Sequence, residues 1–437
     1  MIYPRFTADS FWNYQAACDL VGARYPAPPL GLITVAALLP KSWAVRLVNR
    51  NTEDLAGADL EWADLVMTGG MLFQQPDSLR IVEMCRTRGL PVVCGGPDVT
   101  STPNIYRAAD FRVLGEAESV MDDFVAAWRS GERHGTFEAP MGETDVTTSP
   151  VPRFDLLKFD QYLHIGIQFS RGCPFNCEFC DIIELYGRKP RSKTNQQILA
   201  ELDALYALGY RGHVDFVDDN LIGNKKALKI LLPELQRWMH ERRYPFEFST
   251  EASINLSDDP ALLRGLAAAN FFAVFVGIES PDTETLILTR KKQNTRRDLQ
   301  ESIHRIYDAG IFVFAGFILG FDTERQGTAE AIIRCIEDTA IPVCIVGLLY
   351  ALPGTQLERR LLREGRMFPG GDEPCPPDMG EQCTAGLNFV TKRSRVQVLE
   401  DYRTVLASIY EPRAYFGRVR RMIGRLEGGP RQQPSLR

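Results

Sequence analysis

The chain has 437 residues, a formal net charge of −6 and ten cysteines, and 45% of its residues are hydrophobic. This length allows two or three domains with substantial cores, and the ordinary composition excludes a disordered or fibrous protein. The mild acidity gives no general reason to expect a nucleic-acid partner, so we expect none. The first residues lack the apolar run of a secretory signal, and the longest apolar stretches, such as Ile341–Leu349, are too short to span a bilayer. We therefore expect a cytoplasmic protein, in which disulfides are rare.

Residues 1–135 alternate short apolar segments with helical patterns, which predicts a doubly wound parallel sheet. Glycine-containing turns follow the strand ends, where ligands bind in sheets of this type. Glycines that merely tighten turns are the simpler alternative. The predicted helices are Leu30–Leu39 and Pro76–Arg88. The predicted strands are Ala44–Asn49, Asp64–Thr68, Pro91–Cys94 and Asp110–Leu114.

The rest of the chain contains a second alternation of strands and helices. Six strand–helix units predict a partial TIM-like barrel, two units short of the eight-fold form, with its site at the carboxyl ends of the strands. A helical pattern near Arg395–Tyr410 predicts a small, mostly helical C-terminal domain. The six predicted strands are Leu163–Phe169, Val214–Val217, Phe246–Thr250, Ala273–Ile278, Phe312–Leu319 and Val343–Tyr350. The predicted division is a first domain at 1–135, a proline-containing linker at 136–160, the barrel at 161–365 and the C-terminal domain at 366–437.

Three of the ten cysteines, Cys173, Cys177 and Cys180, fall on one short loop after the first strand of the barrel. Three thiolates suit a cubane iron–sulfur cluster whose fourth iron stays open for a ligand. A structural zinc site is the alternative, but it needs a fourth ligand, and the next candidate, His213, is far along the chain. The sequence indicates nothing beyond packing for the seven others, although Cys94 lies beside a glycine turn: Cys18, Cys85, Cys94, Cys335, Cys344, Cys375 and Cys383.

This Cys-x3-Cys-x2-Cys loop, with Phe179 before its last cysteine, resembles the signature of the radical S-adenosylmethionine (SAM) superfamily. The resemblance implies a 4Fe-4S cluster on Cys173, Cys177 and Cys180 whose open iron binds SAM, and cleavage of SAM to a 5′-deoxyadenosyl radical. It also implies an electron donor such as flavodoxin or ferredoxin. Phe179 is expected near the adenine, with core packing as the alternative.

Polar groups and glycines at successive strand ends are expected to complete a SAM site. The superfamily resemblance implies acidic acceptors for the SAM amino group, a carboxylate for the ribose hydroxyls and a glycine-rich strand beside the adenine. A helix cap is the simpler interpretation of any one acidic residue. The residues expected to bind SAM are Phe179, Asp218, Asp219, Glu251, Glu279 and Gly316.

Three motifs of the first domain, Pro28-Pro29-Leu30-Gly31, Cys94-Gly95-Gly96-Pro97 and Leu114-Gly115-Glu116, are similar to the N-terminal domain of cobalamin-binding radical SAM enzymes. With the segments at 180–191 and 216–224, they resemble the subgroup that has an extra C-terminal domain and includes hopanoid methylases. This implies a Rossmann-like cobalamin-binding domain. The residues expected to contact cobalamin are Thr68, Gly69, Gly95, Gly96, Pro97, Gly115 and Glu116.

Two departures from that pattern affect the cobalamin site. No Asp-x-His-x-x-Gly motif is present, so no histidine is expected as lower axial ligand, and residues 68–72 are expected to face the cobalt. The first strand, near Met1–Tyr3, is nearly absent, so either it is short or the protein begins upstream.

The leading hypothesis is a cobalamin-dependent radical SAM methyltransferase that methylates an unactivated carbon of a small apolar or natural-product substrate, such as a hopanoid-like lipid. A cobalamin-binding radical SAM enzyme that performs a cyclisation or rearrangement without methyl transfer is the alternative. A methylthiotransferase would need a second cluster on Cys18, Cys85 and Cys94, whose spacing does not resemble that family. A non-catalytic cofactor-binding sensor would bind cofactor without cleaving SAM.

The C-terminal segment Pro412–Arg437 is basic, with seven arginines against one acid, Glu427. A basic amphipathic terminus predicts contact with an anionic membrane surface, and a solvated terminus is the simpler alternative. The arginines are Arg413, Arg418, Arg420, Arg421, Arg425, Arg431 and Arg437.

Overall fold

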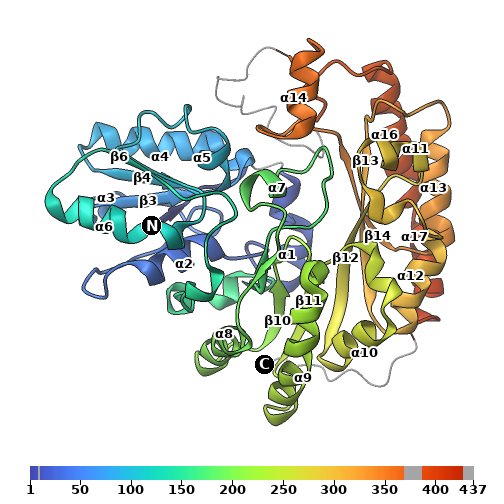
Figure 1. Ribbon diagram of the computed structural model, residues 1–437, viewed down its shortest axis with the longest axis horizontal. Helices are drawn as coiled ribbons and strands as arrows, with labels where there is room; N and C mark the ends of the chain where they lie inside the picture. Colours follow the sequence, from blue (N-terminus) through green and yellow to red (C-terminus); the bar gives the residue numbers. More distant parts are fainter. Residues whose placement is uncertain (8–9, 369–385, 427–437) are drawn as a thin grey trace. The chain divides into compact units, whose positions relative to one another are not determined.

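The computed structural model describes residues 1–7, 10–368 and 386–426 (Figure 1). It contains two six-stranded sheets, in the orders β2-β1-β3-β4-β5-β6 and β14-β13-β12-β11-β10-β7. The strands are β1 (Ile2–Tyr3), β2 (Val48–Asn49), β3 (Val66–Gly69), β4 (Val92–Gly95), β5 (Phe111–Leu114), β6 (Gly135–Glu138), β7 (Ile165–Ile167), β8 (Ser170–Arg171), β9 (Arg191–Ser192), β10 (Gly212–Phe216), β11 (Phe246–Glu251), β12 (Phe271–Glu279), β13 (Phe312–Leu319) and β14 (Val343–Leu348).

Helices connect most of these strands, as expected of an α/β fold. The α-helices are α1 (Gln15–Val21), α2 (Leu30–Leu38), α3 (Gly57–Trp62), α4 (Gln75–Thr87), α5 (Pro97–Ser101), α6 (Met121–Ser130), α7 (Ile182–Leu185), α8 (Asn195–Ala207), α9 (Lys225–Glu241), α10 (Pro260–Ala268), α11 (Thr283–Leu288), α12 (Leu299–Asp308), α13 (Thr328–Thr339), α14 (Gln356–Arg363), α16 (Arg395–Ile409) and α17 (Pro412–Ile423).

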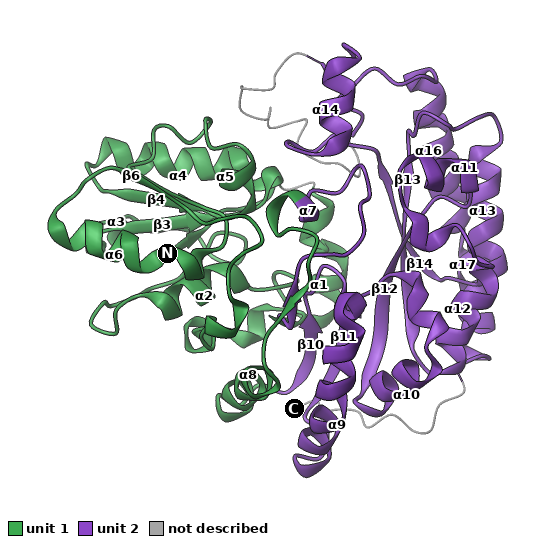
Figure 2. Ribbon diagram, in the orientation of Figure 1, with its two compact units in different colours: residues 1–167, 184–210, 369–381 green, residues 168–183, 211–368, 382–437 purple. Residues whose placement is uncertain are grey.

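The described chain divides into two compact units (Figure 2). The first comprises Met1–Ile167 and Glu184–Tyr210, and the second comprises Gln168–Ile183, Arg211–Phe368 and the described residues from 386 on. Because α8 clusters with the first unit, these units differ from the predicted division at 135, 160 and 365. Those domain boundaries therefore stay a prediction.

The first sheet is parallel and doubly wound, as the sequence predicted. Side chains alternate between its two faces because successive strand residues point in opposite directions. Val66 and Val92 pack in one core with α4, whereas their neighbours Met67 and Val93 pack in a second core with α6. Helices therefore cover both faces, and the carboxyl ends of the strands remain at one edge.

The first and last strands of this sheet in chain order are β1 and β6. The first strand is present but short, since β1 has two residues and pairs with both β2 and β3. At the start of the predicted linker, Gly135–Glu138 forms the edge strand β6 beside β5. An edge strand needs one apolar face, and here Phe137 alone supplies it by stacking on Phe111, with ring centroids 6.3 Å apart. Residues 135–138 therefore contain no run of apolar residues that would indicate a strand.

The second sheet is the predicted partial barrel. From β10 to β14, each strand pairs in parallel with the next one in the chain. Helices α10, α12 and α16 contact its outer face (Figure 1). Trp238 of α9 stacks on Phe246 at 5.6 Å and marks the outer face, whereas His213 contacts Phe272 at 5.0 Å on the inner face.

Helix α17 binds to the second unit through its arginines. Arg418 is fully buried, donates to the backbone oxygens of Ile341 and Ile409, and pairs with Glu337. Arg421 also pairs with Glu337. Arg418 is therefore not available to an outer basic surface, and contact of this segment with an anionic membrane stays a prediction. Arg431, Arg437 and Glu427 lie outside the described residues.

Within the described ranges, no helix is both long enough and apolar enough to cross a membrane.

Candidate functional site

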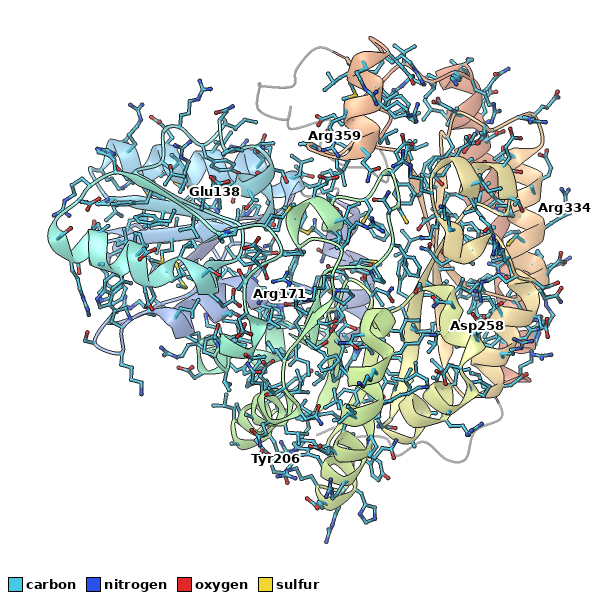
Figure 3. The ribbon with its side chains drawn as sticks, viewed as in Figure 1. Glu138, Arg171, Tyr206, Asp258, Arg334 and Arg359 are labelled. Atoms are coloured by element: carbon cyan, nitrogen blue, oxygen red, sulfur yellow. The ribbon has the colours of Figure 1, made fainter. Side chains whose placement is uncertain are left out.

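The cysteine loop, residues 171–180, begins directly after β8 in the second unit. Arg171, labelled in Figure 3, fixes the start of the loop by donating from Nε to Gln168 Oε1 at 2.7 Å. Cys177 is buried, and Cys173 and Cys180 are partly buried. Burial raises the pKa of each of the three thiols above its ordinary value.

Two carboxylates at the end of β10 bind the backbone that leads into the loop. Asp218 is buried and accepts hydrogen bonds from Phe169 N at 2.9 Å, Ser170 N at 2.5 Å and Ser170 Oγ at 2.5 Å. Asp219 accepts from Gly172 N at 2.9 Å. Burial raises the pKa of Asp218 to about 7, although its hydrogen bonds act in the opposite direction. Asp218 therefore positions the loop.

Asn220, the next residue, links a cysteine to the end of β11. Its Nδ2 donates to Cys173 Sγ at 3.9 Å and to Ser253 Oγ at 3.0 Å. Its Oδ1 accepts from Ser253 N at 3.1 Å. Three consecutive side chains after one strand therefore hold the first half of the loop.

The second half of the loop is held by the segment that follows α11. Glu178 N donates to Thr289 O at 2.9 Å, and Gln293 Nε2 donates to Cys177 Sγ at 3.7 Å. From α14, Arg360 forms a bidentate pair with the Glu178 carboxylate at 2.6 and 3.1 Å. Bidentate arginine pairs fix orientation as well as charge. The cysteine loop is thus bound by several separate elements of its own unit.

A buried ion pair lies beside the loop. Glu279, at the end of β12, pairs with Lys291, and each side chain is 10% exposed. Burial acts most strongly on the pKa of Lys291 and lowers it, but the Glu279 carboxylate and the thiols of Cys177 and Cys180 together raise it above its ordinary value. Burial raises the pKa of the Cys177 thiol, and Lys291 opposes this increase more strongly than Glu279 adds to it. Lys291 is therefore the charge that acts more strongly on Cys177.

A further carboxylate, Glu251, lies at the end of β11. Burial, together with the smaller effect of the nearby carboxylates of Asp215, Asp219 and Asp218, raises the pKa of Glu251 to about 8. Its side chain still keeps solvent access. A carboxyl of this kind is ready to pair with an ammonium group, which would favour its ionised form.

The three cysteines suit a cluster better than a single ion. Within the described residues, no three His, Cys, Asp or Glu side chains come close enough to share one metal ion. A cubane binds each thiolate to a different iron, so its cysteines do not converge on one point. The hydrogen bonds to Cys173 and Cys177 resemble those that tune cluster sulfurs.

In the first unit, glycines bring the carboxyl ends of β3, β4 and β5 close to one another. A Cβ on Gly69 would lie 2.7 Å from Gly95 O, and Gly96 and Gly115 have positive φ angles of 90° and 77°. Positive φ is readily adopted only by glycine. Beside them, Thr68 Oγ1 is buried and has no hydrogen-bond partner among the described residues. This edge offers backbone and a spare hydroxyl to a ligand.

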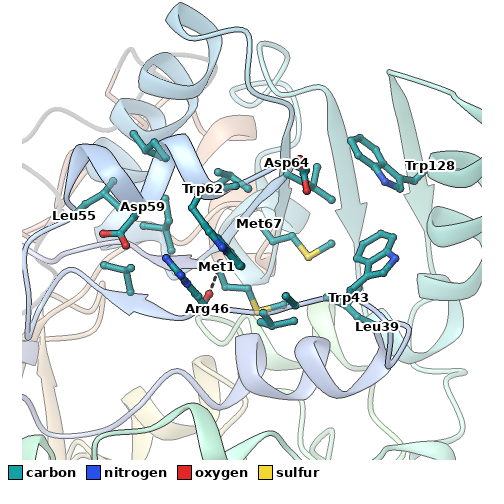
Figure 4. Close-up of a pocket in the computed structure, with 18 of the residues that line it drawn as sticks. Met1, Leu39, Trp43, Arg46, Leu55, Asp59, Trp62, Asp64, Met67 and Trp128 are labelled. Atoms are coloured by element: carbon teal, nitrogen blue, oxygen red, sulfur yellow. Dashed lines mark hydrogen bonds between the residues drawn. The ribbon is translucent and has the colours of Figure 1, made fainter.

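A pocket of about 480 Å³ lies elsewhere in the first unit, at the amino ends of β1 and β3. Trp43 and Trp128 line one side, and Trp62, with Arg46 stacked 4.1 Å from its ring centroid, lines the other (Figure 4). Ligands of open parallel sheets bind at the opposite, carboxyl edge. This pocket is therefore not the candidate site.

The sequence is similar to known proteins over almost its full length. Residues 167–336 match the radical SAM superfamily, and residues 355–437 match a domain of unknown function, DUF4070. An uncharacterized methyltransferase of Synechocystis sp., sll1242, is 44% identical, covering 100% of this chain and 80% of the relative. The hopanoid C-2 methylase of Rhodopseudomonas palustris is 36% identical, covering 95% of this chain and 77% of that protein. The chain belongs to the radical SAM methyltransferase family. The predicted superfamily and subgroup are thereby confirmed.

The fold of this radical SAM methyltransferase is also found among solved structures. The radical SAM methyltransferase TsrM from Kitasatospora setae, solved with cobalamin and a [4Fe-4S] cluster, has a TM-score of 0.69 at 16% identity. The match covers 94% of this chain and 90% of TsrM. It confirms the predicted fold class.

The second unit places Asp218, Asp219, Glu251 and Glu279, all predicted to bind SAM, at the carboxyl ends of its strands. Phe179 packs against Phe321 at 5.9 Å, and a Cβ on Gly316 would lie 2.8 Å from the Phe275 ring. Glu279 forms an ion pair with Lys291, a residue that no sequence motif indicated. The SAM-binding roles themselves stay predictions.

The residues predicted to contact cobalamin lie at one edge of the first sheet, where Glu116 has a structural role. Glu116 is buried in an ion pair with Arg191 at 2.7 Å and therefore holds its turn in place. Cys94, considered for the same edge, is fully buried in a hydrophobic core. Cys85 packs in that core as well, and Cys375 and Cys383 lie outside the described residues.

Sequence reasoning missed the residues that hold the cysteine loop. Asn220, Gln293 and Arg360 are polar residues on separate elements, and no spacing rule connects them with the cysteines. Asn220 was the one detectable case, because it directly follows two acidic residues at a strand end.

Proposed function

We propose that this chain is a cobalamin-dependent radical SAM methyltransferase that methylates an unactivated carbon of an apolar or natural-product substrate. The observation that carries the proposal is the loop with the three cysteines, which is held by side chains that follow β10, by the segment after α11 and by α14. A hopanoid is a candidate substrate because the relative from Rhodopseudomonas palustris is named a hopanoid C-2 methylase.

Cys173, Cys177 and Cys180 would hold the 4Fe-4S cluster, which with SAM supplies reductive cleavage to a carbon-centred radical. The role of the surrounding residues is to position the cysteine loop. Asp218 and Asn220 fix the entry to the loop, and burial limits access of water to the thiols. Exclusion of water protects a reactive radical from side reactions.

Glu251 would accept the SAM ammonium group. Burial and the neighbouring carboxylates raise the pKa of Glu251, so its ionised form is disfavoured in the protein alone. An incoming ammonium would supply that partner and release the proton. At Gly316 the inner face of β13 has no side chain, and the Phe275 ring occupies that space.

Thr68, Gly69, Gly95 and Gly96 would receive cobalamin, which supplies the methyl group. A buried hydroxyl without a partner is costly unless a ligand or water satisfies it, so Thr68 fits a ligand-binding edge. The backbones of Gly69 and Gly95 approach each other closely at this edge, where a Cβ on Gly69 would lie 2.7 Å from Gly95 O.

The inner face of the barrel suggests an apolar substrate with a limited polar part. On β10 and β11 this face carries polar groups, since His213 Nε2 lies 2.6 Å from Ser249 Oγ and Ser249 bonds to Asp215. On β13 it carries aromatic rings, with Phe312 and Phe314 4.5 Å apart. One aromatic wall and one polar wall would orient such a substrate.

The test is an anaerobic assay of protein reconstituted with iron and sulfide, supplied with SAM, methylcobalamin, a one-electron reductant and a hopanoid. We expect 5′-deoxyadenosine and S-adenosylhomocysteine, measured by liquid chromatography with mass spectrometry, and a product heavier by one methylene. Cys177→Ala should abolish 5′-deoxyadenosine, whereas the matched variant Cys335→Ala should keep it. Normal 5′-deoxyadenosine formation by Cys177→Ala would refute the cluster assignment. Formation of 5′-deoxyadenosine without S-adenosylhomocysteine, on an authentic substrate, would support a non-methylating radical reaction instead.

A further inference from the structure

Lys291 occupies an unusual place for a lysine. It is 8% exposed, although the adjacent Lys292 is exposed to solvent. Its Nζ pairs with Glu279 and lies 5.9 Å from the centroid of the Phe179 ring. In the sequence, Phe179 lies between Cys177 and Cys180. Burial of a lysine costs free energy unless the charge is paired or used.

The backbone around this ion pair is adapted to hold it. A Cβ on Gly277 would lie 2.7 Å from Lys291 Nζ and would also collide with the Glu279 carboxylate. Glu279 itself has a φ of 64°, in the left-handed region that residues other than glycine rarely adopt. Such a conformation costs free energy and persists where the surroundings impose it. Asn294 Nδ2 imposes it here by donating to both Gly277 O and Ile278 O at 3.1 Å.

The segment that carries Lys291 is fixed to the cysteine loop on both sides of the lysine. Before it, Thr289 O accepts from Glu178 N at 2.9 Å. After it, Gln293 Nε2 donates to Cys177 Sγ at 3.7 Å. The segment that carries the cation is therefore fixed to the loop that carries the thiols.

We propose that Lys291 is the buried cation that stabilises the one-electron-reduced state of the cluster, and that Glu279 and Gly277 position it. This inference rests on the proposed function, because it requires a cluster on the three cysteines. The reduced cluster carries one more negative charge than the oxidised cluster, and the electron comes from an external one-electron donor. A fixed cation in a site of low dielectric stabilises the more negative state and raises the reduction potential.

Glu279 has the opposite effect on the same equilibrium. Its carboxylate disfavours the added electron, and its ion pair keeps Lys291 in place. Neutralising the cation and neutralising the anion should therefore shift the potential in opposite directions. A general structural disturbance would not produce this sign pattern.

The experiment is a potentiometric titration of the reconstituted holoprotein, with dithionite as reductant and electron paramagnetic resonance as readout. Lys291→Met should lower the ratio of reduced to oxidised cluster about tenfold at a fixed potential, which is about 59 mV for a one-electron couple. Lys291→Arg should stay within about twofold of the wild type, since it keeps the charge. Glu279→Gln should raise the ratio. The matched control Lys292→Met, which removes an exposed lysine one position away, should leave it within about twofold.

The proposal is overturned if Lys291→Met shifts the ratio no more than Lys292→Met, or if Lys291→Met and Glu279→Gln shift it in the same direction. If Lys291→Met retains less iron than the wild type, Glu279→Gln decides the question, and an unchanged or lower ratio in that variant refutes the proposal. Failure of the proposed function looks different, because the wild-type protein would then show no cluster signal at about four irons per chain.

Discussion

Replacing Asp218 by alanine removes a buried carboxylate that accepts three hydrogen bonds from the chain entering the cysteine loop. The Ser170 hydroxyl can rotate toward another acceptor, but the backbone N–H groups of Phe169 and Ser170 stay buried in fixed places. A buried donor without a partner costs about 1–3 kcal/mol, so two of them cost about 2–6 kcal/mol. Removal of a buried charge, whose pKa is raised to about 7, offsets part of that loss. We expect the free energy of unfolding to fall by about 3 kcal/mol.

The assay is urea unfolding of the cluster-free protein under reducing conditions, followed by circular dichroism. Hydrogen–deuterium exchange on the peptide spanning residues 168–183 locates the effect, since the loop should exchange faster in the variant. The matched control is Glu400→Ala, which removes an exposed carboxylate on α16 of the same unit and should change stability by less than about 0.5 kcal/mol. A loss below about 1 kcal/mol, or unchanged exchange in 168–183, would refute the assignment of Asp218 as the anchor of the loop.

Three further predictions follow from the same structure. Arg418→Met should lower the free energy of unfolding by about 3–5 kcal/mol in urea, because it leaves two buried carbonyl oxygens without their donor and removes one of the two arginines that pair with Glu337. The exposed Arg420→Met should have little effect, and equal effects would contradict this account. Gly277→Ala should weaken SAM binding in equilibrium dialysis, because the new methyl group displaces the Glu279 ion pair, and unchanged binding would show that the space is not needed. SAM binding should release a proton near pH 7 and tighten as the pH rises toward 8.5, since Glu251, with a pKa of about 8, starts protonated and must ionise to receive an ammonium. Calorimetry in two buffers of different ionisation enthalpy measures this release, and Glu251→Gln should abolish it.

The strands of the barrel were predictable because each is a buried apolar run between helices. The predicted strand Phe312–Leu319 has the bounds of β13. The edge strand β6 was missed because one apolar side chain, Phe137, is enough to pack it. The cysteine spacing predicted the candidate cluster ligands, since three thiols on one loop have few other uses.

The supporting residues were not predictable because their roles depend on tertiary position. Lys291 and Lys292 are adjacent and chemically identical, yet one is buried beside the cysteine loop and the other is exposed. Arg418 belongs to a segment that reads as a solvated basic terminus, but it is fully buried. Glu116 follows a turn at the ligand-binding edge, and its partner Arg191 lies 75 residues away in the sequence.

The chain returns to the first compact unit after the cysteine loop, and this limits how the protein can be recombined. Arg191 donates to Glu116 and to Thr144 O, and Gln197 Nε2 donates to Ser149 O at 2.9 Å. A chimera joined at one point near residue 160 would therefore combine the first sheet of one parent with the 184–210 segment of the other. Exchange between relatives preserves these contacts with one crossover after residue 210, or with three crossovers if residues 168–183, which contain the cysteine loop, are exchanged separately. Natural variation that moves the cysteine loop between backgrounds faces the same constraint.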